Sequence, residues 1–182
     1  MFGIISPTCA ILCFFLKKVE RMVALHIVLL EPEIPQNTGN IGRTCNAMGA
    51  VLHLVEPLGF SLADKYLKRA GMDYWKALKV KYYRDFADFL EKNPRGQKVF
   101  VSRKAIHRCD RFAYASEVYL VFGKESVGLP DELLKANQDL CVRIPMTPGT
   151  RSLNLANTVA ILSYEVMRQY AFLGLRTAGE FD

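Results

Sequence analysis

The feature that most constrains the fold is an uninterrupted apolar run, residues 118–122, that ends at Gly123. Because the run contains no charged side chain, it suits a central strand of a sheet that is covered on both faces by helices. The loop after Gly123 leads into Pro130, Asp131 and Glu132. Proline in a first turn, with acidic residues beside it, indicates the start of a helix, because the first N–H groups of a helix are unpaired and its dipole is positive there.

The same alternation of strand and helix extends through most of the chain. Further strands are predicted at 25–30, 50–55, 80–83, 98–102 and 140–144, and helices after Pro35 and at 62–71, 85–92 and 152–172. Strands that alternate with helices at this spacing are typical of an α/β domain with a mainly parallel sheet flanked by helices. No internal repeat or linker divides the sequence, and its length suits a single domain.

The first 21 residues differ from the rest. Residues 1–16 are almost wholly apolar and are followed by Lys17 and Lys18, whereas Met22 begins a second stretch that is typical of a strand. The apolar run is too short to span a bilayer, and its charges follow it instead of preceding it as in a signal peptide. We expect residues 1–21 to be a dispensable extension of one domain at 22–182. A segment that docks on a membrane or a partner is the alternative.

Composition limits the partners and the compartment. The net charge of +6 favours anionic partners, nucleic acid first, although many basic proteins bind no anion specifically. Basic residues gather in the segment 103–111, which is predicted as a loop. The five cysteines are odd in number and form no C-x-x-C pair, which argues against a disulfide framework and against a zinc site. A cytoplasmic protein with reduced thiols, no metal and no membrane partner fits best.

Two loops that follow predicted strands are the candidate binding site. In an open α/β sheet, ligands bind beyond the carboxyl ends of the strands. The loop at 123–128 and the proline-containing loop before Ser152 offer backbone N–H groups that can bind an adenine, a carboxylate or a phosphate, although each loop alone could be a simple connection. Glu125 either binds substrate or braces the first loop by accepting backbone N–H groups.

A polar ridge is predicted on the helix that follows Pro35. Asn37, Asn40, Arg43 and Asn46 are spaced three apart and therefore share one side of a helix. Such ridges usually face solvent. Three amides and one arginine, with no Lys or Glu among them, favour recognition of a ligand.

The signatures of several other enzyme classes are missing. There is no Walker A pattern, no G-x-G-x-x-G after a strand and no G-x-S-x-G, which argues against a nucleotide triphosphatase, a Rossmann dehydrogenase and an α/β-hydrolase. The three histidines are scattered. His26 and His53 fall within predicted strands and are expected at the edge of the core and not in catalysis.

The last predicted helix, 152–172, is amphipathic. Its apolar residues recur every three or four positions, at Leu155, Val159, Leu162 and Val166. Ser152 is the predicted N-cap. The apolar stripe continues into Tyr170, Phe172 and Leu173 and is wider than a small sheet needs. We expect this helix to contribute to a homodimer interface, unless the whole stripe packs on its own sheet.

Three segments together resemble a known enzyme class. The segments NTGNIGRTCNAMGA, FGKESVGLP and IPMTPGTRSLNLANTVAILSYE are similar, in this order, to the three motifs of the SPOUT methyltransferases. From Met22 the chain resembles the minimal TrmL/YibK-like tRNA 2′-O-methyltransferases. The resemblance implies a trefoil knot near the C-terminus, S-adenosylmethionine bound in the knotted loops, a homodimer, and methylation of the ribose 2′-oxygen of the wobble nucleotide in certain leucine tRNAs.

The resemblance also assigns roles by position. It implies a cofactor pocket at Ser102, Gly123, Ile144, Ser152 and Leu153, with Val101 as the alternative to Ser102 because the alignment is loose there. Arg43 matches the first-motif arginine and is the predicted catalytic residue. It either stabilises the developing 2′-alkoxide while holding a phosphate, which we favour, or abstracts the proton. Asn40, Glu125 and Asn154 are predicted to bind substrate or brace the loops.

Two other functions remain open from the sequence. An rRNA ribose 2′-O-methyltransferase would use the same motifs on a different RNA. A basic RNA-binding module without a cofactor would use the loops only as connections.

Overall fold

The computed structural model describes residues 22–61 and 77–179 of the chain. Within these residues, seven parallel strands form one sheet in the order β3-β2-β1-β6-β4-β7-β5. In chain order the strands are Ala24–Leu30 (β1), Val51–Val55 (β2), Val80–Tyr83 (β3), Gln97–Val101 (β4), His107–Arg108 (β5), Glu117–Phe122 (β6) and Cys141–Arg143 (β7). The predicted parallel α/β sheet is confirmed, and the uncharged run at 118–122 occupies its centre, between β1 and β4.

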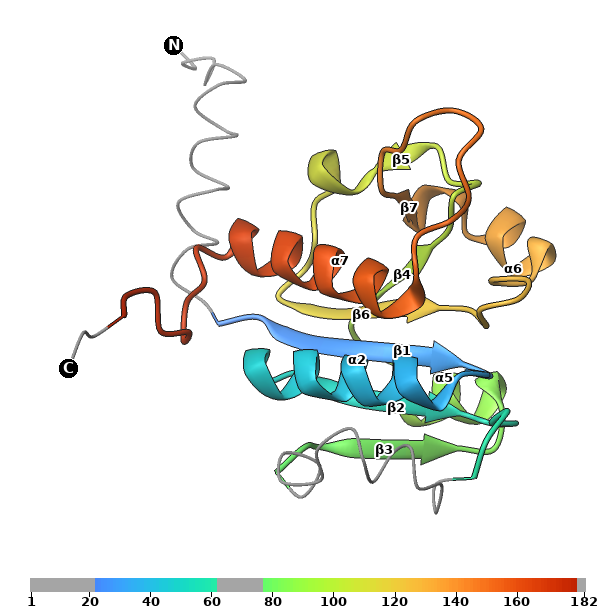
Figure 1. Cartoon of the computed structure of the whole chain (residues 1–182), viewed down its shortest axis with the longest axis horizontal. Helices are drawn as coiled ribbons and strands as arrows, with labels where there is room; N and C mark the ends of the chain where they lie inside the picture. The colour runs from blue at the N-terminus through green and yellow to red at the C-terminus, as the bar shows by residue number, and fades with distance from the viewer. Residues whose placement is uncertain (1–21, 62–76, 180–182) are drawn as a thin grey trace, which may run out of the picture.

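Helices cover both faces of this sheet (Figure 1). The longer pair, α2 (Pro35–Met48) and α7 (Leu155–Gln169), pack against each other on one face, and α5 (Phe86–Lys92) and α6 (Asp131–Ala136) lie on the other. Two short 3₁₀ helices, Cys109–Arg111 (η1) and Gln138–Leu140 (η2), precede β6 and β7. Successive side chains of a strand point to opposite faces, so alternate residues of β1 enter the two hydrophobic clusters.

Several predicted boundaries are wrong or lie outside the described residues. The last helix begins at Leu155 and is capped by Asn154, not by Ser152. It ends at Gln169, because the backbone takes positive φ values at Ala171 and Phe172. The segment 103–111, predicted as a basic loop, contains β5 and η1. The predicted helix at 62–71 and the extension at 1–21 lie outside the described residues.

A chain of buried polar side chains crosses the sheet face beneath α5. His53 is fully buried, its Nε2 lies 2.9 Å from His26 Nδ1, and its Nδ1 lies 2.8 Å from the hydroxyl of Tyr83. The side-chain amide of Asn93 donates to the same hydroxyl at 3.2 Å. Tyr83 can then donate to His53 Nδ1, which leaves Nε2–H of His53 to donate to His26. Burial, with a smaller effect of His26 and Lys81, lowers the pKa of His53 to about 3.

Candidate functional site

Three of the predicted cofactor positions lie at the ends of neighbouring strands. Ser102, Gly123 and Ile144 are each the first residue after a strand, namely β4, β6 and β7. These strands are parallel and adjacent in the order β6-β4-β7. The structure therefore brings the three positions together along the carboxyl end of the sheet, where α/β folds bind their ligands.

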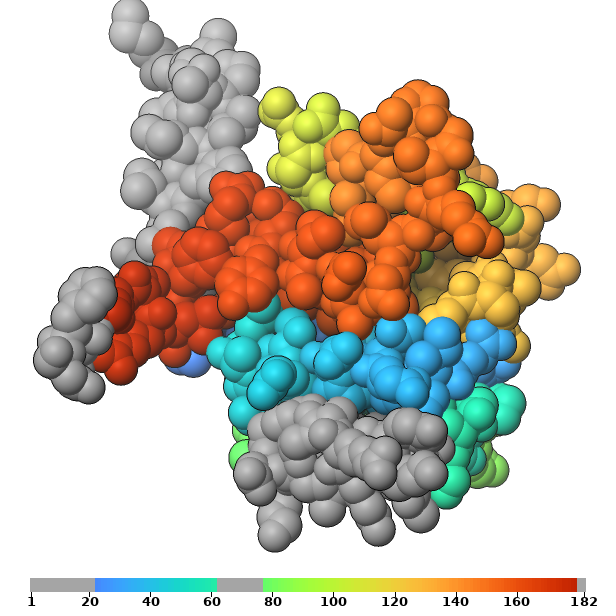
Figure 2. Space-filling view, in the orientation of Figure 1, coloured from blue at the N-terminus to red at the C-terminus, as the bar shows by residue number. Residues whose placement is uncertain are grey.

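The segment 144–154, which contains Ser152 and Leu153, rises above β7 and β5 and descends to α7 (Figure 1). The molecular surface is hollowed between this segment (orange) and the residues that follow β6 (yellow), as Figure 2 shows. Ser152 is exposed, and Leu153 is 40% exposed. Both residues therefore have side chains in contact with solvent beside the strand ends.

The loop after β6 is bound to the segment between β1 and α2 by carboxylates on both sides. Glu125 accepts hydrogen bonds from the backbone N–H of Glu33 at 2.8 Å and from that of the following residue at 3.3 Å. In return, Glu33 accepts the N–H and the hydroxyl of Ser126, both at 2.9 Å, and these bonds lower the pKa of the Glu33 carboxyl. Lys124 pairs with Glu31 at 2.5 Å. Glu125 thus makes loop-bracing contacts of the kind that the sequence suggested.

Asn37 connects these two loops to the start of α7. Its side-chain amide donates to Glu125 Oε1 at 2.9 Å, and its Oδ1 accepts the amide of Asn154 at 2.9 Å. Asn154 Oδ1 in turn accepts the N–H groups of the first turn of α7, at 2.9 and 3.4 Å. Asn37 is 6% exposed, so its polar groups are buried but paired. The predicted polar ridge is therefore divided, because its first member faces inward and the other three are exposed.

Gly123 is required by the packing of its own loop. A Cβ built at this position would lie 2.1 Å from the carbonyl carbon of Gly128 and 2.3 Å from the backbone nitrogen of Leu129. A substitution there disturbs the loop before any ligand is bound.

Arg43 and Asn40 lie further along α2 than Asn37, the residue that bonds to Glu125 and Asn154. Both are exposed on α2, and Arg43 is six residues beyond Asn37, which corresponds to about 9 Å along a helix axis. Arg43 therefore lies nearly two helical turns beyond the residue of α2 that bonds to Glu125.

Sequence reasoning missed Asn37 and Glu33 as members of the site. Asn37 was recognised as polar and periodic, but a residue's position in a ridge does not reveal which member turns inward. Glu33 lies in a connection between strand and helix, and its partner Ser126 is 93 positions away. No local signal links residues that are so distant in the chain.

Neither a metal cluster nor a membrane span is found in the described part of the chain. Within residues 22–61 and 77–179, no group of three or more His, Cys, Asp or Glu side chains could hold a metal ion. No helix in these ranges has the length and apolar character needed to cross a membrane.

Comparison with known proteins gives consistent matches. Residues 24–164 match the model of the SpoU rRNA Methylase family. A Listeria innocua protein, provisionally named tRNA (cytidine(34)-2′-O)-methyltransferase, is 50% identical over 86% of this chain and 95% of its own length. A solved structure described by the methylation of C/U34 on tRNA is 46% identical, covers 82% of this chain and 98% of its own, and has a TM-score of 0.77. An AdoMet-bound rRNA methyltransferase from Sinorhizobium meliloti is 25% identical, with a TM-score of 0.71, and matches over 83% of this chain and 59% of its own.

Proposed function

The chain belongs to the SpoU rRNA Methylase family, and on that premise we propose that it transfers a methyl group from S-adenosylmethionine to the ribose 2′-oxygen of nucleotide 34 in tRNA. The observation that carries the proposal is the match over nearly the full length of relatives with this activity in their names. The chain spans 98% of the C/U34 structure but 59% of the rRNA enzyme. The rRNA alternative is therefore the weaker one, and the family match disfavours a module without a cofactor.

The strand ends suit S-adenosylmethionine. Within residues 144–153, the Thr147 carbonyl accepts both the Thr150 N–H at 3.4 Å and the Thr150 hydroxyl at 2.7 Å, and these two bonds use few of the backbone groups of the segment. Many neutral donors and acceptors therefore remain for an adenine, which backbone groups recognise well. We propose that Ser102, Gly123, Ile144, Ser152 and Leu153 hold the cofactor, with Val101, the last residue of β4, as the alternative to Ser102. When bound, the cofactor supplies an electrophilic methyl group.

The protein must then orient the ribose hydroxyl and assist the loss of its proton, because this hydroxyl is a poor nucleophile at neutral pH. We propose that Arg43 binds a neighbouring phosphate and stabilises the charge that develops on the 2′-oxygen. A guanidinium is a permanent cation with donors only, which argues against a role as base. Asn40, exposed one turn earlier on α2, is proposed to contact the substrate beside it.

Three finer features are also proposed. The trefoil knot is supported by the path of the chain, since β7 lies beyond β4 while α7 returns to pack on α2. A cytoplasmic location is supported by the free thiols of Cys45, Cys109 and Cys141. Leucine tRNAs as substrates rest on the family resemblance alone. The assignment of 22–182 as a single domain and of 1–21 as a dispensable extension is proposed as well.

We propose that the protein is a homodimer that uses the outer surface of α7. Ile161 and Tyr164 are 43% and 52% exposed on this helix, although most of its other apolar side chains are buried. Light scattering at micromolar concentration should give twice the mass of the chain. Tyr164→Asp should shift the mass toward one chain, because it would place a carboxylate in an apolar interface. A wild-type protein of single-chain mass would contradict the proposal.

Mapping the methylated nucleotide tests the function. Purified protein, S-adenosylmethionine and unmodified total tRNA or rRNA should yield 2′-O-methylation at nucleotide 34 of a subset of tRNAs. Nucleotide-resolution sequencing of 2′-O-methyl groups would locate the product. Methylation confined to rRNA would replace the proposal by its rRNA alternative. If the protein bound RNA but calorimetry detected no binding of S-adenosylmethionine, the remaining interpretation would be an RNA-binding module without a cofactor.

A further inference from the structure

The edge of the sheet carries two arginines side by side. The register of β5 and β7 pairs Arg108 with Arg143, and paired residues on neighbouring strands point to the same face. Like charges in such a pair are destabilising. Arg108 is held by Asp110 at 2.8 Å. Arg143 is half-buried and has no ion-pair partner among residues 22–61 and 77–179.

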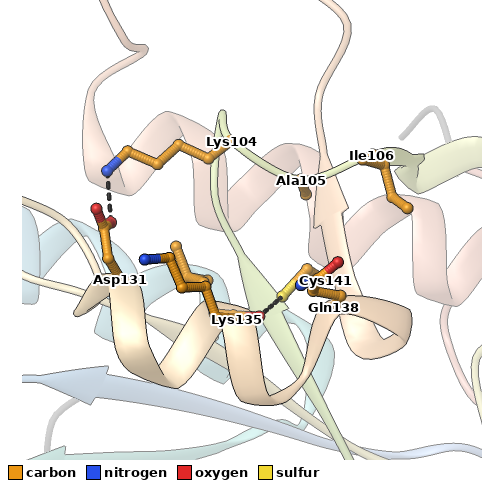
Figure 3. Close-up of a pocket in the computed structure, with 8 residues that line it drawn as sticks. Lys104, Ala105, Ile106, Asp131, Lys135, Gln138 and Cys141 are labelled. Carbon is orange, nitrogen blue, oxygen red and sulfur yellow. Dashed lines mark hydrogen bonds and ion pairs between the residues drawn. The ribbon is translucent and has the colours of Figure 1, made fainter.

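A cavity opens on the same face of this edge. Side chains two residues apart on a strand share a face, so on β7 Cys141 lies on the same side of the sheet as Arg143. Ile106 and Cys141 both line a cavity of about 210 Å³ (Figure 3). Ala105 and Leu134 add apolar lining, and Ile106 is 72% exposed.

The rim of the cavity is cationic. Asp131 pairs with Lys104 at 2.5 Å, and this contact, with a smaller contribution from Lys135, lowers the pKa of the Asp131 carboxyl. Figure 3 shows the Lys104–Asp131 pair on one side of the cavity and Lys135 beside it on α6. Asp131 is the only carboxylate among the described residues that line the cavity, which include Lys104 and Lys135, and Arg143 adds a further positive charge on the same face of the sheet.

We propose that this surface is a second RNA-binding site, in which an unpaired base of the tRNA enters the cavity and its flanking phosphates bind Arg143, Lys135 and the neighbouring cations. The inference rests on the proposed function. An apolar hollow with cations around it fits a base and its phosphates, because unpaired bases are bound by apolar contact and the backbone by Lys and Arg. The size of the cavity suits one base and not a base pair.

The site borders the cofactor loops. Lys104 is two residues beyond Ser102, whose hydroxyl accepts the Lys104 N–H at 3.2 Å, and Asp131 begins the helix that follows the braced 123–128 loop. One RNA can therefore contact both places at once. The second contact would hold the RNA without touching the reacting atoms, so it contributes to affinity and not to the chemical step.

Binding of a tRNA anticodon stem-loop tests the proposal. Arg143→Gln and Lys135→Gln should each weaken binding about tenfold at low salt, and each should reduce the slope of log affinity against log salt by about 0.7, the value for one phosphate contact of single-stranded RNA. The matched control is Arg95→Gln, which removes the same charge from an exposed position. Arg95 precedes β4, whereas Lys104 and the cavity follow the opposite end of that strand. Its affinity and slope should stay at the wild-type values. S-adenosylmethionine affinity and the rate at saturating tRNA should be unchanged in all three variants.

Crosslinking locates the base. RNA that carries 4-thiouridine at single unpaired positions should crosslink to peptides that contain residues 104–106 or 134–141, and mass spectrometry would identify them. The second site would be overturned if Arg143→Gln and Lys135→Gln bound the tRNA stem-loop as tightly as Arg95→Gln does. Crosslinks confined to other peptides would overturn it as well. Wild-type protein that fails to methylate tRNA would instead overturn the proposed function, and the two failures are therefore distinguishable.

Discussion

Replacing Arg43 by alanine is expected to lower the rate of methyl transfer to tRNA by about a hundredfold or more, the usual scale for loss of one transition-state donor. Arg43 is an exposed residue in the middle of α2 and is proposed to stabilise charge on the ribose 2′-oxygen. Arg43→Lys should also be impaired, because lysine keeps the charge but loses the two-pronged geometry that fits a phosphate. Single-turnover methylation with saturating tRNA and S-adenosylmethionine is the measurement.

Asn46→Ala provides the control for this experiment. Asn46 lies one turn beyond Arg43 on the same exposed ridge, so its loss perturbs α2 similarly without removing a cation, and the rate should stay near the wild-type value. Cofactor affinity should change little in either variant. A near-normal rate in Arg43→Ala would remove Arg43 from the mechanism, whereas an equal loss in Asn46→Ala would mean that the helix and not the arginine is responsible.

Acidification from pH 7 to pH 5 is expected to lower the free energy of unfolding by about 2 kcal/mol through His53 alone, at 1.4 kcal/mol per pH unit below the ordinary histidine pKa. The folded state keeps His53 neutral because its pKa is lowered from 6.5 to about 3. The unfolded chain takes up a proton near pH 6.5. The contribution of His53 to the free energy of unfolding is therefore fully present above pH 6.5 and decreases as the pH falls toward 3.

Unfolding in guanidinium chloride at pH 7, 6 and 5 measures this slope. His53→Gln retains an amide that can contact Tyr83 or His26 but does not titrate, so it should be less stable at pH 7 and lose less stability on acidification. His26 contributes in the same direction, because burial lowers its pKa, partly offset by Glu117. Part of the slope should therefore persist in His53→Gln. Equal slopes in the two proteins would show that His53 takes up a proton in the folded state as readily as in the unfolded chain.

The strands were predictable because their cause is local. β1, β2 and β6 are mainly apolar runs closed by a charged residue or glycine, and β1, expected at 25–30, spans Ala24–Leu30. β5 escaped prediction because it consists of His107 and Arg108, which are not apolar, and exists only through its pairing with β7. A two-residue strand has no periodicity of its own.

The strand ends that carry the candidate site were predictable, but the contacts between the loops that follow them were not. Ser152 and Asn154 are both good N-cap residues, and the side chain that caps α7 also bonds to Asn37, 117 positions earlier. The two histidines were placed correctly in strands, but their mutual hydrogen bond joins residues 27 positions apart. Such choices depend on tertiary contacts, which neither propensity nor spacing encodes.

The central place of β6 also affects how the protein is made. Ala24 of β1 pairs with Glu117 of β6, so a nascent chain that ends before residue 117 exposes one side of β1 as an unpaired edge. At a synthesis rate of 5–20 residues per second, the 93 intervening positions take roughly 5–19 s to appear. During that interval the edge can pair with a strand of another chain. Emergence of β6 from the ribosome is therefore the event that closes this edge of β1.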